Sequence, residues 1–334
     1  MEQRWTDLFP TLPLKHAVPA QIPWWRNRRL TPWLLQAAVG LLLLVLVAFL
    51  VGNLVHNLAA TGLLLSWKWL GNPAGFDIAG SLLPFQADQP YWWALLAGLL
   101  NTVRVVVVGL LGATLLGTTL GVASFSSNGL LRGLARVYVE LIRNIPLLLQ
   151  LMFWYFVVFL ALPGGADALR WPGVVLAQSG LYLGNAELVN GVWQAPLRLS
   201  VEFSALLTGL VVYSAAFVSE VVRGGIAAVP KGQWEAARSL GFTPLQTLQK
   251  VVLPQALPVM VPGLNNQYIS LAKNSSLAIA CGYTDLYSVA ETTLNQTGRA
   301  VEVMVLLLGS YLLIDLLISA GMNALNRVVQ LKER

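Results

Sequence analysis

Residues 223–277 read RGGIAAVPKGQWEAARSLGFTPLQTLQKVVLPQALPVMVPGLNNQYISLAKNSSL, and this stretch decides how the rest of the chain is interpreted. It is a mostly polar interruption between apolar segments that are too long for helices of a soluble core. Its first half predicts a helix over residues 233–240, because Gly241 suits the left-handed residue that closes a helix. The stretch therefore begins with a short helix that ends sharply.

A second short helix is predicted to follow the first. Thr243 and Pro244 supply its N-cap and its first helical turn. Because Pro254 disfavours helix at the residue before it, this second helix is predicted to end at about Leu253. The pair offers apolar surface that nothing local covers, and its residues are Trp234, Ala236, Ala237, Leu240 and Phe242. We therefore expect the pair to dock on a protein partner.

The composition places the chain in a membrane. It has 334 residues, of which 56% are hydrophobic and 11% are charged, whereas soluble domains carry roughly a quarter charged residues. The net charge is +6, but the basic residues lie between apolar runs, which indicates topology signals and not a nucleic-acid surface. Cys281 is the only cysteine, which excludes an internal disulfide framework and a cysteine metal cluster.

Six apolar segments are predicted to span the membrane as helices. They cover residues 33–58, 94–124, 138–162, 203–222, 258–283 and 301–325. The third segment is interrupted at Arg143-Asn144-Ile145-Pro146. The first begins only after about thirty polar and proline-rich residues and is long enough to span, so we expect it to stay as an anchor and not to act as a cleaved signal peptide.

The distribution of positive charge predicts the orientation of these spans. Residues 59–92 hold only three charges, from Lys68, Asp77 and Asp88, and are therefore predicted to lie outside. The docking stretch, residues 223–257, carries four basic residues and only one acidic residue, Glu235. The basic residues are Arg223, Lys231, Arg238 and Lys250. This excess predicts that the docking stretch and both termini are cytoplasmic.

The chain divides by composition into three parts. Residues 1–32 form a cytoplasmic or interfacial tail, and residues 33–93 add a first membrane helix and an outer loop. Residues 94–330 form the third and largest part, with an outer-face insertion at 163–200 and a cytoplasmic loop at 223–257.

The tail and the insertion carry the weakest patterns. The prolines of the tail and its run Trp24-Trp25-Arg26-Asn27-Arg28-Arg29 favour an extended segment at the membrane surface, with an unstructured terminus as the alternative. The insertion has mixed polarity, and its charged residues Asp167, Arg170, Glu187 and Arg198 sum to zero. We expect it to elaborate the outer face, and an interfacial helix is one form that it could take.

The spacing inside the docking stretch carries a family resemblance. Glu235-Ala236-Ala237, then Gly241, then Val251-Val252-Leu253-Pro254 resemble the EAA signature of permease subunits in binding-protein-dependent ABC importers. The flanking runs Glu220 to Ile226, Pro230 to Ala237 and Leu253 to Ala256 are similar to the polar amino-acid branch of that family, the histidine/glutamine type.

A second motif extends the resemblance to residues 94–330. Residues 138–143, with Pro146 and Gln150, are similar to another motif of the amino-acid permease branch. That motif has Gly-Thr where this chain has Asn144-Ile145.

The resemblance implies an all-α membrane protein with about six transmembrane helices, which are the five helices of a type I importer permease plus one N-terminal helix. It implies a transporter subunit and not an enzyme, located in a bacterial inner membrane. The expected partners are an ATPase dimer, a second permease subunit, an extracytoplasmic amino-acid-binding protein, the amino acid and membrane lipid, with no nucleic acid. The residues that would couple to the ATPase are Gln233, Glu235, Ala236, Ala237, Leu240, Gly241 and Pro254.

Charged residues inside spans are candidates for a substrate path, because each costs roughly 2.5–3.5 kcal/mol at a helix centre and needs a partner or a watery cavity. They are Arg104, Glu140, Arg143, Lys273 and Asp315. An α-amino acid needs donors, acceptors and apolar volume, and broken helices supply backbone groups at this depth. The candidate path therefore comprises the two polar breaks, with residues Arg143, Asn144, Lys273, Asn274, Ser275 and Ser276.

Structural roles for these residues are the alternative. Glu140 and Arg143, three residues apart, would pair with each other. Asp315 would be the counter-charge of Arg104. The Lys273 stretch resembles a family sequence, Lys-Asp-Thr-Ser-Leu, in which an internal Lys-Asp pair would be structural, and here Asn274 replaces that carboxylate. The small residues Gly309, Ser310, Ser319 and Gly321 would pack on a second permease subunit or, equally, within this one.

Catalytic motifs are missing from the sequence. His16 and His56 are isolated, so there is no His-Glu-x-x-His metal pair, and no Gly-x-x-x-x-Gly-Lys-Ser/Thr phosphate loop occurs. We expect no metal or cofactor in this chain, with ATP and Mg bound by the partner ATPase. Two alternatives remain, which are an importer permease for another small polar solute and an ATP-independent membrane channel or scaffold.

Overall fold

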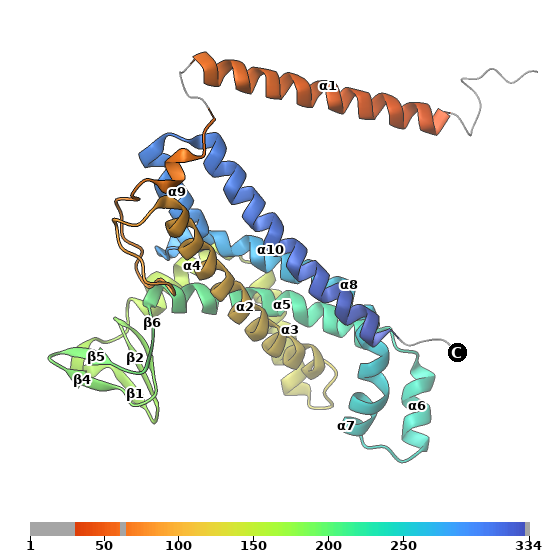
Figure 1. Ribbon diagram of the computed structural model, residues 1–334. Helices are drawn as coiled ribbons and strands as arrows, with labels where there is room; N and C mark the ends of the chain where they lie inside the picture. The colour runs from red at the N-terminus through yellow and green to blue at the C-terminus, as the bar shows by residue number, and fades with distance from the viewer. Residues whose placement is uncertain (1–30, 61–64, 331–334) are drawn as a thin grey trace, which may run out of the picture. The chain divides into compact units, whose positions relative to one another are not determined.

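The computed structural model describes residues 31–60 and 65–330, and the chain forms two compact units, Met1–Leu65 and Ser66–Arg334. The described part of the first unit is one helix, α1 (Thr31–Ala60), drawn in orange in Figure 1. It is apolar on all sides, and none of its residues is buried, as expected for a helix that lipid surrounds. This confirms the helix predicted at 33–58, whereas the predictions for residues 1–30 of the tail fall outside the described residues.

The second unit is a helical bundle with a small lobe of strands (Figure 1). Its long helices are α2 (Tyr91–Ala123), α5 (Val201–Ala227), α8 (Leu253–Asn274) and α10 (Ala300–Val329). The shorter ones are α3 (Gly129–Arg143), α4 (Leu147–Met152), the π-helix η4 (Phe153–Phe159), the 3-10 helix η7 (Ser275–Cys281) and α9 (Leu286–Thr297).

The described residues contain four helices that are long and apolar enough to cross a membrane, namely α1, α2, α5 and α10. A fifth span is formed if α3 is taken together with α4 and η4 as one bent span. The predicted span 258–283 corresponds to α8 and η7, where polar residues such as Asn265, Asn266 and Lys273 lower the mean hydropathy. The predicted all-α membrane class is confirmed.

Close packing of α2 against α5 forms the centre of the bundle. A Cβ added at Gly117 would lie 2.6 Å from Val218 Cβ and 2.8 Å from the carbonyl oxygen of Ala215. One turn further along, a Cβ at Gly121 would lie 2.7 Å from Val222 Cβ. Glycine lets two helices approach closely in lipid, where packing replaces the hydrophobic effect. The glycine-rich sequence of α2 is therefore explained by its contact with α5.

We predict that Gly117→Val lowers the stability of the purified chain, because the new side chain overlaps α5 and overpacking costs about 1–3 kcal/mol. Thermal unfolding in detergent, followed by the loss of the monodisperse elution peak, measures the effect. Gly309→Val is the matched control, since a Cβ at Gly309 of α10 meets nothing within 4 Å. Equal midpoints for the two variants would contradict the packing argument.

The predicted break at Arg143 to Pro146 is confirmed, but the course of the predicted span 138–162 is wrong. α3 begins earlier, at Gly129, and the helices on the two sides of the break are bent by 105°. Gln150 Nε2 donates to the carbonyl oxygens of Ile142 (2.9 Å) and Ile145 (3.0 Å), which lose their helical partners at the bend. The amide of Gln150 therefore stabilises the corner.

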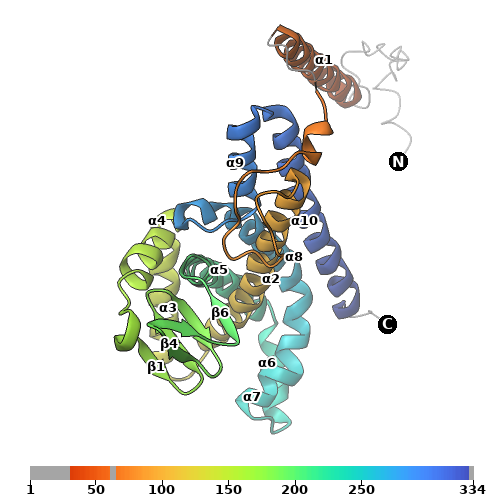
Figure 2. The same cartoon turned by 60° about the vertical axis from the view of Figure 1, so that its left-hand side comes forward.

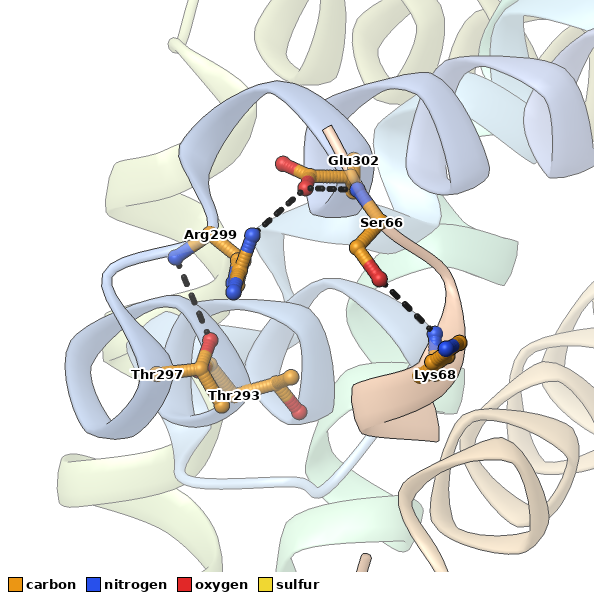
Figure 3. Close-up of polar contacts among 6 residues, drawn as sticks. All are labelled: Ser66, Lys68, Thr293, Thr297, Arg299 and Glu302. Atoms are coloured by element: carbon orange, nitrogen blue, oxygen red, sulfur yellow. Dashed lines mark hydrogen bonds and ion pairs between the residues drawn. The ribbon is translucent and has the colours of Figure 1, made fainter. Parts of the chain in front are cut away.

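The loop before α2 is bonded to the corner between α9 and α10 (Figure 3). Glu302 is 3% exposed and accepts hydrogen bonds from the backbone N–H of Ser66 (3.2 Å) and from Arg299 Nη1 (3.3 Å). The 3-10 helix η3 (Lys68–Gly71) follows, and Tyr91 Oη at the start of α2 donates to Gln296 Oε1 of α9 at 2.9 Å. These bonds join the loop before α2 to the last two helices.

The insertion at 163–200 is a lobe of strands, and an interfacial helix is therefore the wrong form for it (Figure 2). The 3-10 turn η5 (Gly165–Asp167) leads into one antiparallel sheet of order β1-β2-β3-β6 and a separate hairpin β4-β5. The strand bounds are β1 (Leu169–Trp171), β2 (Val174–Ala177), β3 (Gly180–Leu183), β4 (Glu187–Val189), β5 (Val192–Gln194) and β6 (Leu197–Leu199).

Turn chemistry explains why the insertion folds as strands. Val189 pairs with Val192 across Asn190-Gly191, whose positive φ angles of 51° and 78° fit the two-residue hairpin turn that Asn-Gly favours. Tyr182 and Trp193 are buried among the few apolar residues of the lobe. Alternating burial along β2 and β3 gives the lobe a small core of its own.

Candidate functional site

The predicted docking pair is a helical hairpin formed by α6 (Lys231–Ser239) and α7 (Pro244–Thr247). Gly241 closes the first helix with φ +78°, as the sequence predicts. Thr243 caps α7, since its Oγ1 accepts from the backbone N–H of Gln246 (3.3 Å) and its own N–H donates to Gln246 Oε1 (3.0 Å). The predicted turn residues therefore form the hairpin.

The predicted end of the second helix at Leu253 is wrong. α7 continues through the π-helix η6 (Leu248–Val252) directly into α8. Pro254 directly follows this wider π turn, which shifts the hydrogen-bond ladder and lets the helix continue past the proline. The second helix of the hairpin, α7, and the membrane helix that holds Lys273 are thus one uninterrupted helical element.

The hairpin covers part of its own apolar surface, contrary to the prediction. Ala237 is 2% exposed, and Trp234 packs on a buried cluster built by α5, η6 and α8. Leu240 and Leu245 at the tip stay 76% and 61% exposed. Gln255 Nε2 of α8 donates to Gln233 Oε1 of α6 at 3.2 Å. The apolar surface that is left for a partner is therefore the tip of the hairpin.

A charged cavity of about 560 Å³ lies between α3 and α5, beside the end of α2. Its basic side chains come from Arg136, Arg143 and Arg223, and its acidic ones from Glu140 and Glu220. Glu220 Oε2 lies 2.7 Å from Arg223 Nη2 and 3.8 Å from Arg143 Nη1. The predicted pairing of Arg143 with Glu140 is therefore wrong, because Glu220 on the neighbouring helix lies closer to the guanidinium.

Lys273 pairs with Asp315 across α8 and α10, at 3.6 Å between Nζ and Oδ2. The predicted pair of Asp315 with Arg104 is wrong, since the Arg104 guanidinium lies 4.1 Å above the ring of Phe203. The Lys273 side chain is 62% exposed, whereas that of Asp315 is 16% exposed. Lys273 therefore has an internal partner while its charged end remains accessible.

The other residues of the two polar breaks bond to their own helices. Ser275 Oγ donates to the carbonyl oxygen of Ala272 (2.7 Å), and Ser276 Oγ to that of Lys273 (2.8 Å). Asn144 Nδ2 donates to the carbonyl oxygen of Glu140 at 2.7 Å. Within residues 65–330, no hydrogen bond or ion pair joins the two breaks. Arg143 and Lys273 are thus the charged side chains that the breaks present.

The segments that follow the two breaks do pack together. Leu147 and Leu151 of α4 share a buried cluster with Ala278 and Cys281 of η7. The sulfur of Cys281 lies 3.9 Å from the carbonyl oxygen of Leu151. We therefore expect a movement of one break to displace the other through this apolar contact.

Sequence reasoning missed a polar cluster that holds α9. Asn101 Nδ2 on α2 donates to the carbonyl oxygen of Thr284 at 2.8 Å, and the N–H of Leu286 donates to Thr102 Oγ1 at 3.0 Å. The buried Asp285 caps α9 through the N–H of Ser288 at 2.9 Å. The sequence signal was the aspartate before an apolar run, which is typical of a helix N-cap.

Residues 113–330, more than half of the chain, match the family described as "Binding-protein-dependent transport system inner membrane component". The chain therefore belongs to this family of multi-pass inner membrane transport proteins.

Individual relatives agree with this assignment. The chain is 35% identical to the putative amino-acid ABC transporter permease protein YhdX of Escherichia coli K12, covering 92% of this chain and 96% of that one. It is 35% identical to the general L-amino acid transport system permease protein AapQ of Rhizobium johnstonii, covering 84% and 88%. A crystal structure of an amino acid ABC transporter with histidines is similar at a TM-score of 0.54 and 26% identity, covering 71% of this chain and 94% of that one.

We predict that Lys273→Met destabilises the chain, because it leaves the largely buried carboxylate of Asp315 without a counter-charge. Asp315→Leu added to Lys273→Met is expected to recover much of the loss. Thermal unfolding of the wild type, both single variants and the double variant measures a coupling of about 0.5–3 kcal/mol. Strictly additive effects would show that the pair has no structural role.

Proposed function

We propose that the chain is the permease subunit of an ATP-driven amino-acid importer and that it couples to an ATPase through the hairpin of α6 and α7. The observation that carries this proposal is the hairpin itself, whose exposed tip is formed by Leu240 and Leu245 and whose second helix, α7, continues unbroken into the membrane domain. The permease names of its relatives support amino acids as the substrate class.

The exposed hairpin and the family to which the chain belongs support the following assembly. Two permease subunits enclose one path, and each presents its hairpin to one subunit of an ATPase dimer that binds ATP and Mg. The basic residues of the docking stretch support a cytoplasmic hairpin and cytoplasmic termini. A substrate-binding protein delivers the amino acid from outside.

The proposed substrate path runs along the two polar breaks. Arg143 and Lys273 are the residues of the path that offer accessible charge. Asn144, Ser275 and Ser276 shape the breaks through bonds to their own helices, and Asn274 ends α8. A zwitterionic substrate needs both donors and acceptors, which the broken helices supply.

Coupling requires the hairpin to move as a body. Closure of the ATPase dimer displaces the tip of the hairpin, and η6 carries this displacement into α8. The bond between Gln233 and Gln255 ties α6 to α8, and Pro258 and Pro262 lie within α8 on its way to Lys273. The displacement therefore reaches the second polar break.

Gly241→Val tests the coupling role of the hairpin. Valine at φ +78° is strained, and a left-handed conformation costs about 1–2 kcal/mol for an L-residue. We predict at least a tenfold loss of ATP-dependent amino-acid uptake in proteoliposomes that hold the full complex, with the membrane domain intact. Gly232→Val is the control, since Gly232 lies inside α6 in open space with no positive φ.

Normal uptake by Gly241→Val would contradict the docking role. Uptake or conductance by the purified chain without an ATPase would support a channel instead of a permease. The substrate class is tested by competition. If added amino acids leave uptake unchanged while another polar solute inhibits it, the substrate class is that of the inhibiting solute.

A further inference from the structure

The cavity between α3 and α5 lies on one particular side of α3. Leu130, Leu134, Val137 and Leu141 form an exposed apolar stripe along this helix, as their spacing of four, three and four residues requires. Arg136 and Glu140 lie outside this stripe and line the cavity. An apolar stripe in a membrane protein faces lipid or another apolar surface, so the cavity lies on the side of α3 that faces α5.

The two helices that form the cavity, α3 and α5, are joined by a hydrogen bond and by packing. Tyr138 Oη of α3 donates to the carbonyl oxygen of Val212 of α5 at 2.7 Å. Ala135 and Val139 of α3 are buried at the base of the cavity. Its walls are therefore set by packing and by a hydrogen bond between side chain and backbone.

Only some of the charged groups of the cavity form ion pairs within the chain. Glu220 is shared by Arg223 and Arg143, which leaves one positive charge in excess in that group of three. Neither Arg136 nor Glu140 forms an ion pair with any other residue that the structure describes. The cavity therefore offers accessible guanidinium groups and one free carboxylate within the same space.

We propose that this cavity binds a free amino acid as a zwitterion, at the cytoplasmic end of the path. Arg136 and Arg143 receive the carboxylate, since guanidinium groups bind carboxylates with paired hydrogen bonds. Glu140 receives the ammonium group, and Phe125 and Val139 border the side chain. This proposal rests on the proposed function, because it takes the transported solute to be an amino acid.

Size and position agree with this assignment. A volume of about 560 Å³ falls within the roughly 300–1,000 Å³ of small-molecule sites. Phe125 and Ala227 also line a second hollow of about 430 Å³, which Trp234, Glu235 and Arg238 of the hairpin border. An amino acid in the cavity therefore lies next to the element proposed to contact the ATPase.

The rate at which a maleimide labels a cysteine placed at the edge of the cavity measures whether the cavity is occupied. Ala227 lines the cavity, and its neighbour Ala228 is exposed but does not line it. The native Cys281 is buried, so we expect it not to react with the label. The full chain in lipid nanodiscs, carrying either Ala227→Cys or Ala228→Cys, is labelled with a maleimide in the presence of alanine, glutamine, glutamate or arginine.

We expect at least one of these amino acids to slow labelling of Ala227→Cys at least fivefold and to leave Ala228→Cys unchanged. The decarboxylated amine and the deaminated acid of that amino acid are expected to protect at least tenfold more weakly. On the Ala227→Cys background, Arg136→Gln and Glu140→Gln are each expected to raise the half-protecting concentration at least tenfold. Arg327→Gln and Glu291→Gln, which remove exposed charges elsewhere, serve as matched controls.

Three results would overturn the proposal. These are no protection by any of the four amino acids, equal protection by inorganic phosphate, and equal protection of both cysteine variants. Uptake by the full complex, measured in parallel, separates the two proposals. Uptake without protection rejects the cavity alone, whereas protection without ATP-dependent uptake keeps the cavity and rejects the importer.

Discussion

The close contact between α2 and α5 is the constraint on which the second unit depends. Gly117 and Gly121 admit the side chains of Val218 and Val222, so that the two helices pack without a layer of larger side chains between them. α5 begins at the lobe of strands, forms one wall of the charged cavity and ends just before the hairpin. Without the glycines of α2, the helix that joins these three parts would lack a fixed position.

The hairpin and α8 are the second central feature, because α7 runs into α8 as one helical element and α6 is bonded to α8 through Gln233 and Gln255. Prolines normally end helices, yet the π turn at residues 248–252 places Pro254 in the first turn of α8. A displacement at Leu245 of α7 is then transmitted to Lys273 without passing through a loop. This continuity supports a mechanical role for the EAA-like stretch, in addition to the resemblance that the sequence carries.

The sequence predicted the local features well, because they depend on neighbouring residues. Gly241, Thr243 and Pro244 act as turn, cap and first helical residue, and the break at Arg143 is where it was predicted. The course of the helix after Pro254 was mispredicted, because the π turn that accommodates the proline has no simple sequence signature. The strands at 163–200 carried an Asn-Gly turn signal at residues 190–191, but mixed polarity obscured it.

The pairing of charges could not be predicted from spacing. Arg143 pairs with Glu220 and Lys273 pairs with Asp315, in each case on another helix. These contacts depend on how α3, α5, α8 and α10 are arranged. The same limit applies to the cavity, whose lining residues come from α3 and the turn before it and from α5, which is distant in the sequence. Individual charged residues were therefore identified as candidates, while the site that they form emerged only from the fold.

The central claim is that the hairpin and α8 move together. Spin labels placed by Ser239→Cys and Val259→Cys measure the distance within this element, and labels placed by Ser239→Cys and Ser127→Cys measure its distance from the loop after α2. Pulsed electron resonance on the full complex, with and without ATP, compares the two distances. The account predicts an unchanged first distance and a changed second one. A change in the first distance with the second unchanged would contradict it.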